Sequence, residues 1–172
     1  MAALQRAGLS VEIVSGDRPA VTEWAAQALA IDRASGNLSI EAKAELVRQL
    51  RERGLEPAFV GDGTNDALAM GEATASVAVG RPTDEALSAS GFVLLGGRLA
   101  ALPRLFAAGR KLRRVIVQNY LWAFAFNSLF VPVAAAGKLV PLAAVLLMLL
   151  SSSGVLLNSL RMRSGPPLAH RA

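Results

Sequence analysis

The stretch Val60–Ala67, VGDGTNDA, follows a short apolar run and places two carboxylates, an amide and two glycines within eight residues. The run at 58–60 predicts a buried strand, and the glycines predict a tight turn before a helix that begins near Asn65. Two carboxylates on one such turn repel each other unless a cation lies between them, and hard oxygen ligands favour Mg²⁺. The glycines also let the backbone approach a phosphate closely. Taken alone, a Gly-Asp-Gly motif is more often a plain turn in which Asn65 or Asp66 caps a helix.

Short apolar strands alternate with helices through the first part of the chain. Besides the strand at 58–60, strands are predicted at 11–14, 76–79 and 92–95, and helices at 21–31, 41–53 and around 83–89. Ser39 is the expected N-cap of the helix at 41–53, and Gly54 ends it. This alternation predicts a parallel, doubly wound α/β sheet, whose chemistry lies at the carboxyl ends of its strands. Both acidic turns, 15–17 and 61–63, fall at that edge.

The remainder of the chain is suited to a lipid bilayer. Hydrophobic residues make up 53% of the 172 and the mean hydropathy is +0.41, yet residues 115–160 contain a single charged side chain, Lys138. A basic amphipathic helix runs into the apolar run 115–136, and a polar break at Gly137-Lys138 separates it from a second run, 139–160. Each run has about the 20 residues needed to cross a bilayer as a helix. We therefore expect an all-α, two-helix transmembrane hairpin.

Basic side chains flank both ends of the apolar block and give the chain much of its net charge of +5. They are Arg104, Arg110, Lys111, Arg113 and Arg114 before it, and Arg161, Arg163 and Arg171 after it. This arrangement places both outer ends in the cytoplasm of a multi-pass plasma-membrane protein, and it argues against nucleic acid as a partner. Residues 1–10 contain no apolar core of a signal peptide. The absence of cysteine excludes disulfides and thiolate metal sites within this chain.

Two further groups complete a pattern suited to phosphoryl chemistry. Lys43 lies at the start of the helix at 41–53, and Ser15 offers a hydroxyl beside Asp17 at the end of the first strand. A lysine, a hydroxyl and a carboxylate pair that binds Mg²⁺ can hold a phosphoryl group, with catalysis by positioning and electrostatics. The combination, rather than Gly-Asp-Gly alone, favours a functional site.

The whole set resembles the phosphorylation domain of the P-type cation-transporting ATPases, which has the haloacid-dehalogenase-like fold. In that family a Thr-Gly-Asp motif contacts the phosphate, a lysine neutralises the phosphoenzyme, and a Gly-Asp-Gly-x-Asn-Asp loop holds Mg²⁺. The resemblance implies that Lys43 is the neutralising lysine and that Ser15 replaces the usual threonine, which keeps the hydroxyl. It further implies phosphate contacts from Ser15, Gly16 and Asp17, and a Mg²⁺ loop formed by Asp62, Asn65 and Asp66, whose two carboxylates are the metal ligands.

Polar side chains also lie near the middle of both predicted spans. Asn127 is in the first, and the i, i+3, i+4 spacing of Met148, Ser151 and Ser152 places them on one helix face of the second. In an antiparallel hairpin that face can meet Asn127 at the same depth. A thioether with amide and hydroxyl oxygens suits a soft ion such as Cu(I) better than Mg²⁺ or Ca²⁺. The alternative is that the methionine packs as an apolar residue and that Ser and Asn join the helices by hydrogen bonds.

The same segment resembles the last two membrane helices of the heavy-metal branch of the family, its copper-exporting members in particular. Those members carry Tyr-Asn in the first helix and Met-x-x-Ser-Ser in the second, where this chain has Phe126-Asn127 and Met148–Ser152. The resemblance implies that Asn127, Met148 and Ser151 contribute to the site of the transported metal. Phe126 lacks the hydroxyl of the family's tyrosine, which bears on Cu(I) specificity. The similarity extends to Gln118-Asn119, Pro132, Gly137, Pro141 and Asn158–Arg161.

The expected organisation has four parts. They are a partial phosphorylation domain at 1–97, a basic connecting helix at 98–114, two transmembrane helices within 115–163 (about 115–136 and 139–160), and a disordered cytoplasmic tail at 164–172.

The resemblance implies that this chain is the C-terminal portion of an ATP-driven pump that exports a transition metal, with Cu(I) the expected cargo. The sequence contains no Asp-Lys-Thr-Gly segment with the aspartate that such pumps phosphorylate, and no Cys-Pro-Cys metal motif. The nucleotide-binding and actuator domains are also missing. We therefore expect ATP to act through domains that lie before Met1 or on a separate chain, and this chain alone to be inactive.

Two alternatives remain at this stage. One is a catalytically inactive, membrane-anchored binding or regulatory remnant of such a pump, which predicts decay of motifs that are intact here. The other is a membrane-anchored phosphatase of the dehalogenase type. The phosphatase is disfavoured because no strand that ends in Asp-x-Asp precedes Ser15.

Overall fold

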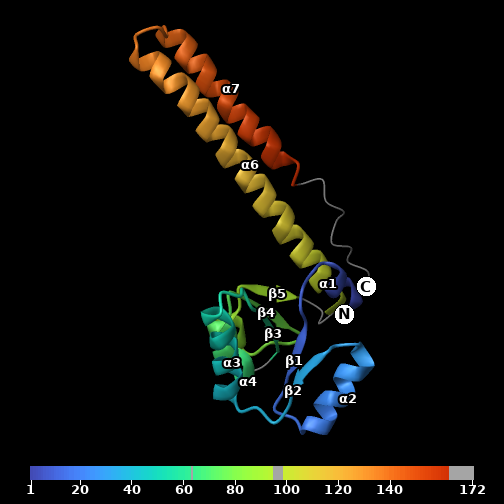
Figure 1. The fold of residues 1–172 in the computed structure, drawn as a ribbon. Coiled ribbons are helices and arrows are strands. Elements are labelled where there is room, and N and C mark those ends of the chain that lie inside the picture. The colour runs from blue at the N-terminus through green and yellow to red at the C-terminus, as the bar shows by residue number, and fades with distance from the viewer. Residues whose placement is uncertain (63, 95–98, 163–172) are drawn as a thin grey trace. The chain divides into compact units, whose positions relative to one another are not determined.

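The computed structural model describes residues 1–62, 64–94 and 99–162 (Figure 1). The chain divides into two compact units, Met1–Pro103 and Arg104–Ala172. The first unit is a layered α/β structure, and the second contains a long helical hairpin. The predicted tail at 164–172 and the predicted strand end at Leu95 lie outside the described residues.

Every strand pair of the first unit is parallel, which confirms the predicted fold class. β1 (Glu12–Val14) pairs with β2 (Arg33–Ser35), and β4 (Ala75–Val79) pairs with both β3 (Ala58–Gly61) and β5 (Phe92–Leu94). The strands form two sheets, β1-β2 and β3-β4-β5, rather than the single sheet that the sequence predicts. Among the described residues no strand pairs with the second edge of β1 or of β3. β2 is absent from the prediction because its sequence, Arg-Ala-Ser, has no apolar alternation.

Helices connect the strands, as parallel pairing requires. They are α1 (Ala2–Arg6), α2 (Pro19–Leu29), α3 (Ile40–Glu52), α4 (Thr64–Glu72) and α5 (Asp84–Ala89). All but α1 agree with the predicted helices to within about two residues, the usual uncertainty of helix ends. α2 begins earlier than predicted because Pro19 occupies its first turn, where a missing N–H costs nothing.

α3 begins at the predicted cap. The Ser39 hydroxyl oxygen accepts the N–H of Ala42 at 3.1 Å, which satisfies one free donor of the first turn. A backbone hydrogen bond at Glu41, together with the Ser39 side chain, lowers the pKa of the Glu41 carboxyl. Since the folded-state pKa is the lower one, ionised Glu41 stabilises the start of α3 above its ordinary pKa and loses that effect as the pH falls.

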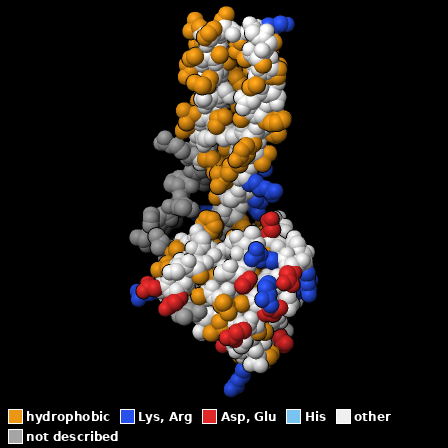
Figure 2. Space-filling model, turned by 90° about the vertical axis from the view of Figure 1, so that its left-hand side faces the viewer, with side chains coloured by type: hydrophobic (Ala, Val, Ile, Leu, Met, Phe, Trp, Pro, Cys, Tyr) orange, Lys and Arg blue, Asp and Glu red, His pale blue; other side chains and the backbone are white. Residues whose placement is uncertain are grey.

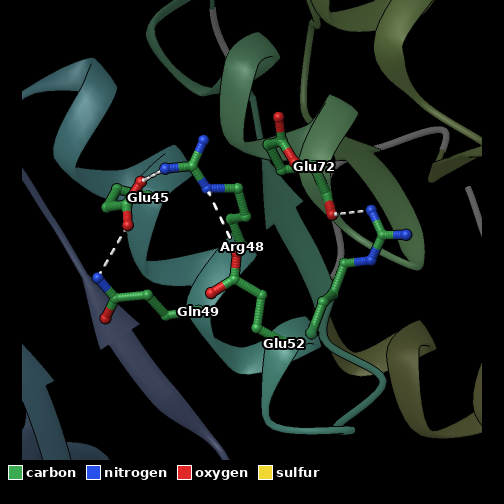
Figure 3. Close-up of polar contacts among 6 residues, drawn as sticks. Glu45, Arg48, Gln49, Glu52 and Glu72 are labelled. Atoms are coloured by element: carbon green, nitrogen blue, oxygen red, sulfur yellow. Dashed lines mark hydrogen bonds and ion pairs between the residues drawn. The ribbon is translucent and has the colours of Figure 1, made fainter.

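The outer face of α3 carries ion pairs. Arg48 contacts Glu45 and Glu52 on the same helix, and Arg51 reaches across to donate a hydrogen bond to the main-chain carbonyl of Glu72 at 3.0 Å (Figure 3). Glu72 is the last residue of α4, so this guanidinium satisfies a free carbonyl at the C-terminus of that helix. The contact ties the end of α4 to α3.

The core of the first unit lies between these helices and the strands β3 and β4. Its buried members are small apart from Phe59 and Met70, which allows the helices to lie close to the sheet. They are Ala44 and Val47 of α3, Phe59 of β3, Ala69 and Met70 of α4, Ala78 of β4 and Ala86 of α5. This packing fixes the positions of the first turns of α3 and α4, from which the candidate site is built.

The second unit is a hairpin of two long helices. The short 3₁₀ turn Leu99–Ala101 leads into α6 (Leu102–Ala135), which continues without a break from the basic segment through the first apolar run, and α7 (Pro141–Leu160) forms the second. Both helices are long and apolar enough to cross a bilayer, and hydrophobic side chains cover their surface in Figure 2. The predicted break is confirmed, with Gly137 at φ +68°, a backbone conformation that glycine adopts readily.

Met70→Ala tests the core of the first unit. Met70 is 1% exposed, so we expect its truncation to lower the free energy of unfolding of this unit by about 2–5 kcal/mol. Leu68 of the same helix is 49% exposed, and Leu68→Ala is expected to change it by less than about 0.5 kcal/mol. Native-state hydrogen exchange of the β4 amides, in the whole chain in detergent, measures both values. Equal effects of the two substitutions would contradict the packing described here.

Candidate functional site

The centre of the candidate site is an ion pair between two helices. The Lys43 ammonium on α3 donates to Asp66 Oδ1 on α4 at 2.9 Å, and the two side chains are only 12% and 16% exposed. Both residues belong to the sets singled out in the sequence, and they come from turns that follow different sheets. The pair therefore shows that the carboxyl ends of β2 and β3 lie on the same side of the unit.

The glycine that ends β3 leaves room for this carboxylate. A Cβ atom on Gly61 would lie 2.5 Å from Asp66 Oδ2 and 2.7 Å from Asp66 Cβ, distances that require the aspartate to move. Asp66 also stands in the first turn of α4, where backbone N–H groups and the helix dipole favour negative charge. Gly61, Lys43 and the start of α4 together fix one orientation of the Asp66 carboxylate.

Of the predicted Mg²⁺ residues of the loop, the two besides Asp66 face solvent. Asp62 and Asn65 are exposed, and Gly80, which follows β4 at φ +78°, lies near Asp62, since a Cβ atom added to Gly80 would be 4.0 Å from Asp62 Cβ. Gly63 of the motif lies outside the described residues. The loop thus combines one carboxylate that is held by a lysine with an exposed carboxylate and an exposed amide.

The turn at 15–17 is stabilised by its own side chains and by a second turn. Ser15 Oγ donates to Asp17 Oδ2 at 2.8 Å and accepts the Asp17 N–H at 3.1 Å. The Asn37 N–H donates to the Asp17 carbonyl at 2.6 Å, and the Leu38 N–H donates to the Ser15 carbonyl at 3.0 Å. Gly16 is exposed between them, so its backbone is accessible to a ligand.

The supporting turn was not singled out from the sequence. Asn37 has φ +58°, and a Cβ atom on Gly36 would lie 2.7 Å from Pro19 Cα and 3.0 Å from the Asp17 carbonyl oxygen. Only glycine fits so close to another backbone segment. The Gly-Asn dipeptide is a turn signal in the sequence, but the sequence does not tell which other loop that turn supports.

The structure brings only some of the predicted residues together. Lys43 and Asp66 are in contact, whereas no hydrogen bond among the described residues links the turn at 15–17 with Asp62, Asn65 or Asp66. Within the described parts of the chain, no three carboxylate or imidazole side chains gather into a metal-binding cluster. The arrangement offers two separate acidic turns rather than a closed cage for a cation.

The predicted membrane site is placed differently from the expectation. Asn127 and Ser152 are exposed, Met148 is 61% exposed, and Ser151 is half-buried. Met148 and Ser152 therefore lie beside the contact line between the helices rather than on it, because successive helix residues are turned by about 100° and the line passes through their neighbours. Phe126 lies on that line instead, with its ring centroid 6.1 Å from Trp122 and 4.6 Å from Phe130. The metal site of Asn127, Met148 and Ser151 stays a prediction.

Comparisons with known proteins show which proteins this chain resembles. Residues 1–74 match the haloacid dehalogenase-like hydrolases. Copper-transporting ATPase 1 of Rhizobium meliloti (strain 1021) is 41% identical over 96% of this chain and 21% of its own length. Cation-transporting P-type ATPase B of Mycobacterium bovis (strain ATCC BAA-935 / AF2122/97) is 39% identical over 95% of this chain and 22% of its own length.

A solved structure agrees with these relatives. The crystal structure of a zinc-transporting PIB-type ATPase superposes on 94% of this chain and 26% of its own, with a TM-score of 0.87 and 29% identity. This chain is a homologue of the heavy-metal P-type ATPases. It spans about a fifth of the length of the curated relatives that it matches. The likeness to these ATPases runs through both units of the chain, so the resemblance drawn from the sequence is confirmed.

Gly61→Ala tests whether the space beside Gly61 holds the Asp66 carboxylate in its position. The added Cβ displaces Asp66 from Lys43, so we expect the affinity of the whole chain for Mn²⁺, a paramagnetic probe of the predicted Mg²⁺ loop, to fall about 10-fold. Gly71→Ala is the matched control, because nothing lies within 4 Å of a Cβ at that position of α4. Electron paramagnetic resonance titration in detergent measures both variants. Unchanged Mn²⁺ affinity in Gly61→Ala would show that Asp66 takes no part in cation binding.

Proposed function

We propose that this chain is the C-terminal portion of an ATP-driven pump that exports a transition metal, Cu(I) in the first instance. It contributes part of the phosphorylation site in its first unit and two membrane helices in its second. The observation that carries the proposal is the Lys43–Asp66 pair at 2.9 Å, because it joins two motifs that lie far apart in the sequence at one edge of the strands. The similarity to copper-transporting relatives over 96% of the chain supports the cargo.

The carboxyl ends of the strands, where the turns 15–17 and 61–63 lie, suit the binding of a phosphoryl group in an acyl phosphate. The backbone of Gly16 and the hydroxyl of Ser15 are at the end of β1, where they can contact the phosphate oxygens. Lys43 supplies a positive charge close to Asp66. In such a site the protein contributes positioning and charge neutralisation rather than covalent chemistry.

The loop after β3 is the proposed Mg²⁺ site. Mg²⁺ retains several waters and takes one or two carboxylates together with phosphate oxygens, which the exposed Asp62 and Asn65 allow. Asp66 is the second carboxylate, and its bond to Lys43 implies that the cation and the ammonium share its charge. When bound, Mg²⁺ neutralises the oxygens of the phosphoryl group. Asp62, Asn65 and Asp66 fit that role, and the remaining ligands would come from the phosphate and from water.

The two sheets have unpaired strand edges, beside which we place the strand that carries the phosphorylated aspartate. One edge of β1 and one edge of β3 have no partner among the described residues, and both strands end at a proposed phosphate or Mg²⁺ turn. A further parallel strand between them would deliver its carboxyl end between Ser15 and Asp62. We propose that the nucleotide-binding and actuator domains, and this strand, come from another part of the same pump or from a second chain.

The hairpin is proposed to span the plasma membrane with both outer ends in the cytoplasm. Basic residues flank α6 at its start and follow α7, and the turn between them carries only Lys138. Exposed polar groups such as Asn127 and Ser152 are costly in lipid, and in membrane proteins they face other helices or an ion path. We propose that Asn127 and Met148 reach the transported metal on the face that further membrane helices cover, and that Ser151, which is half-buried toward α6, contributes from beside them.

A regulatory or binding role without pumping is the second candidate. That role predicts the loss of residues that only phosphoryl chemistry needs. The close approach of Gly61 to Asp66 and the Lys43–Asp66 ion pair are nevertheless both present in the structure. These contacts favour a working phosphorylation site.

Asp66→Asn in the reconstituted pump that contains this chain tests the catalytic assignment. Removing the charge opposite Lys43 is expected to lower metal-stimulated ATP hydrolysis about 100-fold or more. Asp32→Asn, at an exposed position before β2, is the control and is expected to leave it unchanged. Turnover that survives Asp66→Asn would refute the Mg²⁺ and phosphate assignment.

Met148→Leu tests the membrane site. Leucine keeps the apolar volume but lacks the thioether, so we expect Cu(I) to bind the membrane domain of the pump several-fold more weakly. Met162→Leu, beyond the end of α7, is the matched control. Anaerobic titration with a Cu(I) chelator as competitor measures both. The same affinity and stoichiometry in Met148→Leu would return Met148 to a packing role.

A further inference from the structure

The contact line of the hairpin is marked by half-buried side chains on otherwise exposed helices. The half-buried positions include 119, 123, 126, 130 and 133 on α6, and 143, 147, 151, 154 and 158 on α7. Their spacing alternates between four and three residues on α6 and is close to that on α7, which is the pattern of two helices that face each other along one seam. Most of the seam is apolar or small, since it contains Ala123, Phe126, Phe130 and Leu147.

One layer of this seam is polar. Asn158 Nδ2 donates to Asn119 Oδ1 at 2.9 Å, and Asn119 Nδ2 donates to Ser159 Oγ at 3.0 Å. Asn158 Nδ2 also lies 3.4 Å from Gln118 Oε1. We call Gln118, Asn119, Asn158 and Ser159 the polar clasp. Each amide of Asn119 and Asn158 thus has its partner on the opposite helix.

Two further contacts join α6 and α7 in the same alignment, one on each side of the polar clasp. The Lys111 ammonium donates to the main-chain carbonyl of Arg161 at 2.8 Å. The Trp122 ring lies against Gly154, where an added Cβ would be 3.1 Å from Trp122 Nε1 and 3.3 Å from Trp122 Cε2. These contacts follow the clasp on both sides, so the end of the hairpin opposite the Gly137 turn is held at several points.

A polar layer inside an apolar seam selects one alignment of two helices. Rotation or slippage of α7 would separate the two half-buried asparagine amides and break the hydrogen bonds that join the helices. In paired helices a single buried asparagine layer is known to fix register for this reason. The apolar pairs of the seam do not discriminate in this way, because aliphatic and aromatic side chains can repack.

The alignment that the polar clasp fixes determines which residues near the middle of each helix face away from the other helix. Seven positions from Asn119 and from Asn158, Phe126 lies level with Ser151, and eleven positions away Phe130 lies level with Leu147. Asn127 and Met148 each follow a seam residue by one position, so they are turned about 100° off the seam. A one-residue rotation of α7 would exchange Met148 with Leu147 and bury the thioether against α6.

We propose that the polar clasp is a positioning device, which fixes the register and rotation of α7 on α6 and thereby presents Asn127 and Met148 on the outer faces of the hairpin. Asn119, Asn158 and Ser159 are positioning residues, not metal ligands. The consequence for metal transport rests on the proposed function, whereas the register itself is a property of this chain alone.

Disulfide formation between introduced cysteines tests the register directly, because the natural sequence contains no cysteine. The whole chain is reconstituted in lipid nanodiscs with Phe130→Cys and Leu147→Cys, or with Phe130→Cys and Leu146→Cys, and oxidised without metal transport or ATP. Leu147 is on the seam and Leu146 is 58% exposed. We expect the first pair to form an intramolecular disulfide about 10-fold faster than the second, since the bond requires Cα atoms within about 7 Å.

Asn119→Leu with Asn158→Leu removes the polar layer and is expected to reduce this preference to about 2-fold or less, because the apolar seam then permits rotation. Asn119→Ser with Ser159→Asn exchanges two partners across the clasp and is expected to restore the preference. Ser153→Leu, which removes an exposed hydroxyl from α7, is the control and should leave it intact. An unchanged preference in the double leucine variant, or its loss without rescue in the exchanged pair, would overturn the proposal. Neither result depends on ATP or on the transported metal, so failure of the proposed function would be seen separately.

Discussion

The arrangement of the first unit depends on where one carboxylate is held. Asp66 sits against the bare backbone of Gly61 and bonds to Lys43 at 2.9 Å, with both side chains largely shielded from water. A shielded ion pair is costly to separate, because either partner alone would be left without compensation. The small core residues of α3 and α4 bring the two helices close enough for the pair to form. The packing of the core therefore also fixes the positions of the candidate site residues Lys43 and Asp66.

In the second unit, too, a few polar contacts decide how helices pack, but the proposed surroundings are lipid rather than water. In lipid the apolar side chains gain little by facing each other, so polar contacts and close packing decide how two helices align. The polar clasp and the Trp122–Gly154 contact supply both at one end of the hairpin. The remaining polar groups at mid-depth, Asn127 and Ser152, are left on exposed faces, where a larger membrane domain would meet them.

Much of this structure could be predicted from the sequence, and the failures have physical causes. Ser39, Gly137 and the apolar runs carry local signals, so the helices and the hairpin break were predicted close to their observed positions. The strand Arg33–Ser35 carries no such signal, because it is held by its parallel pairing with β1. The Lys43–Asp66 contact joins two residues that the family resemblance singles out. The support of the 15–17 turn by Gly36 and Asn37 depends on tertiary contacts. The outward position of Met148 depends on the helix rotation, which spacing along one helix cannot give.

We propose that this chain holds part of a phosphorylation site that another segment completes. The most direct measurement is to incubate native membranes with [γ-³²P]ATP and the transported metal, quench with acid, and precipitate the labelled material with an antibody against residues of the first unit. We expect a hydroxylamine-sensitive phosphoprotein that contains this chain or is captured with it, since an acyl phosphate on aspartate is cleaved by hydroxylamine. Recovery of the chain without any bound phosphate label, under conditions in which the membranes transport the metal, would contradict the account.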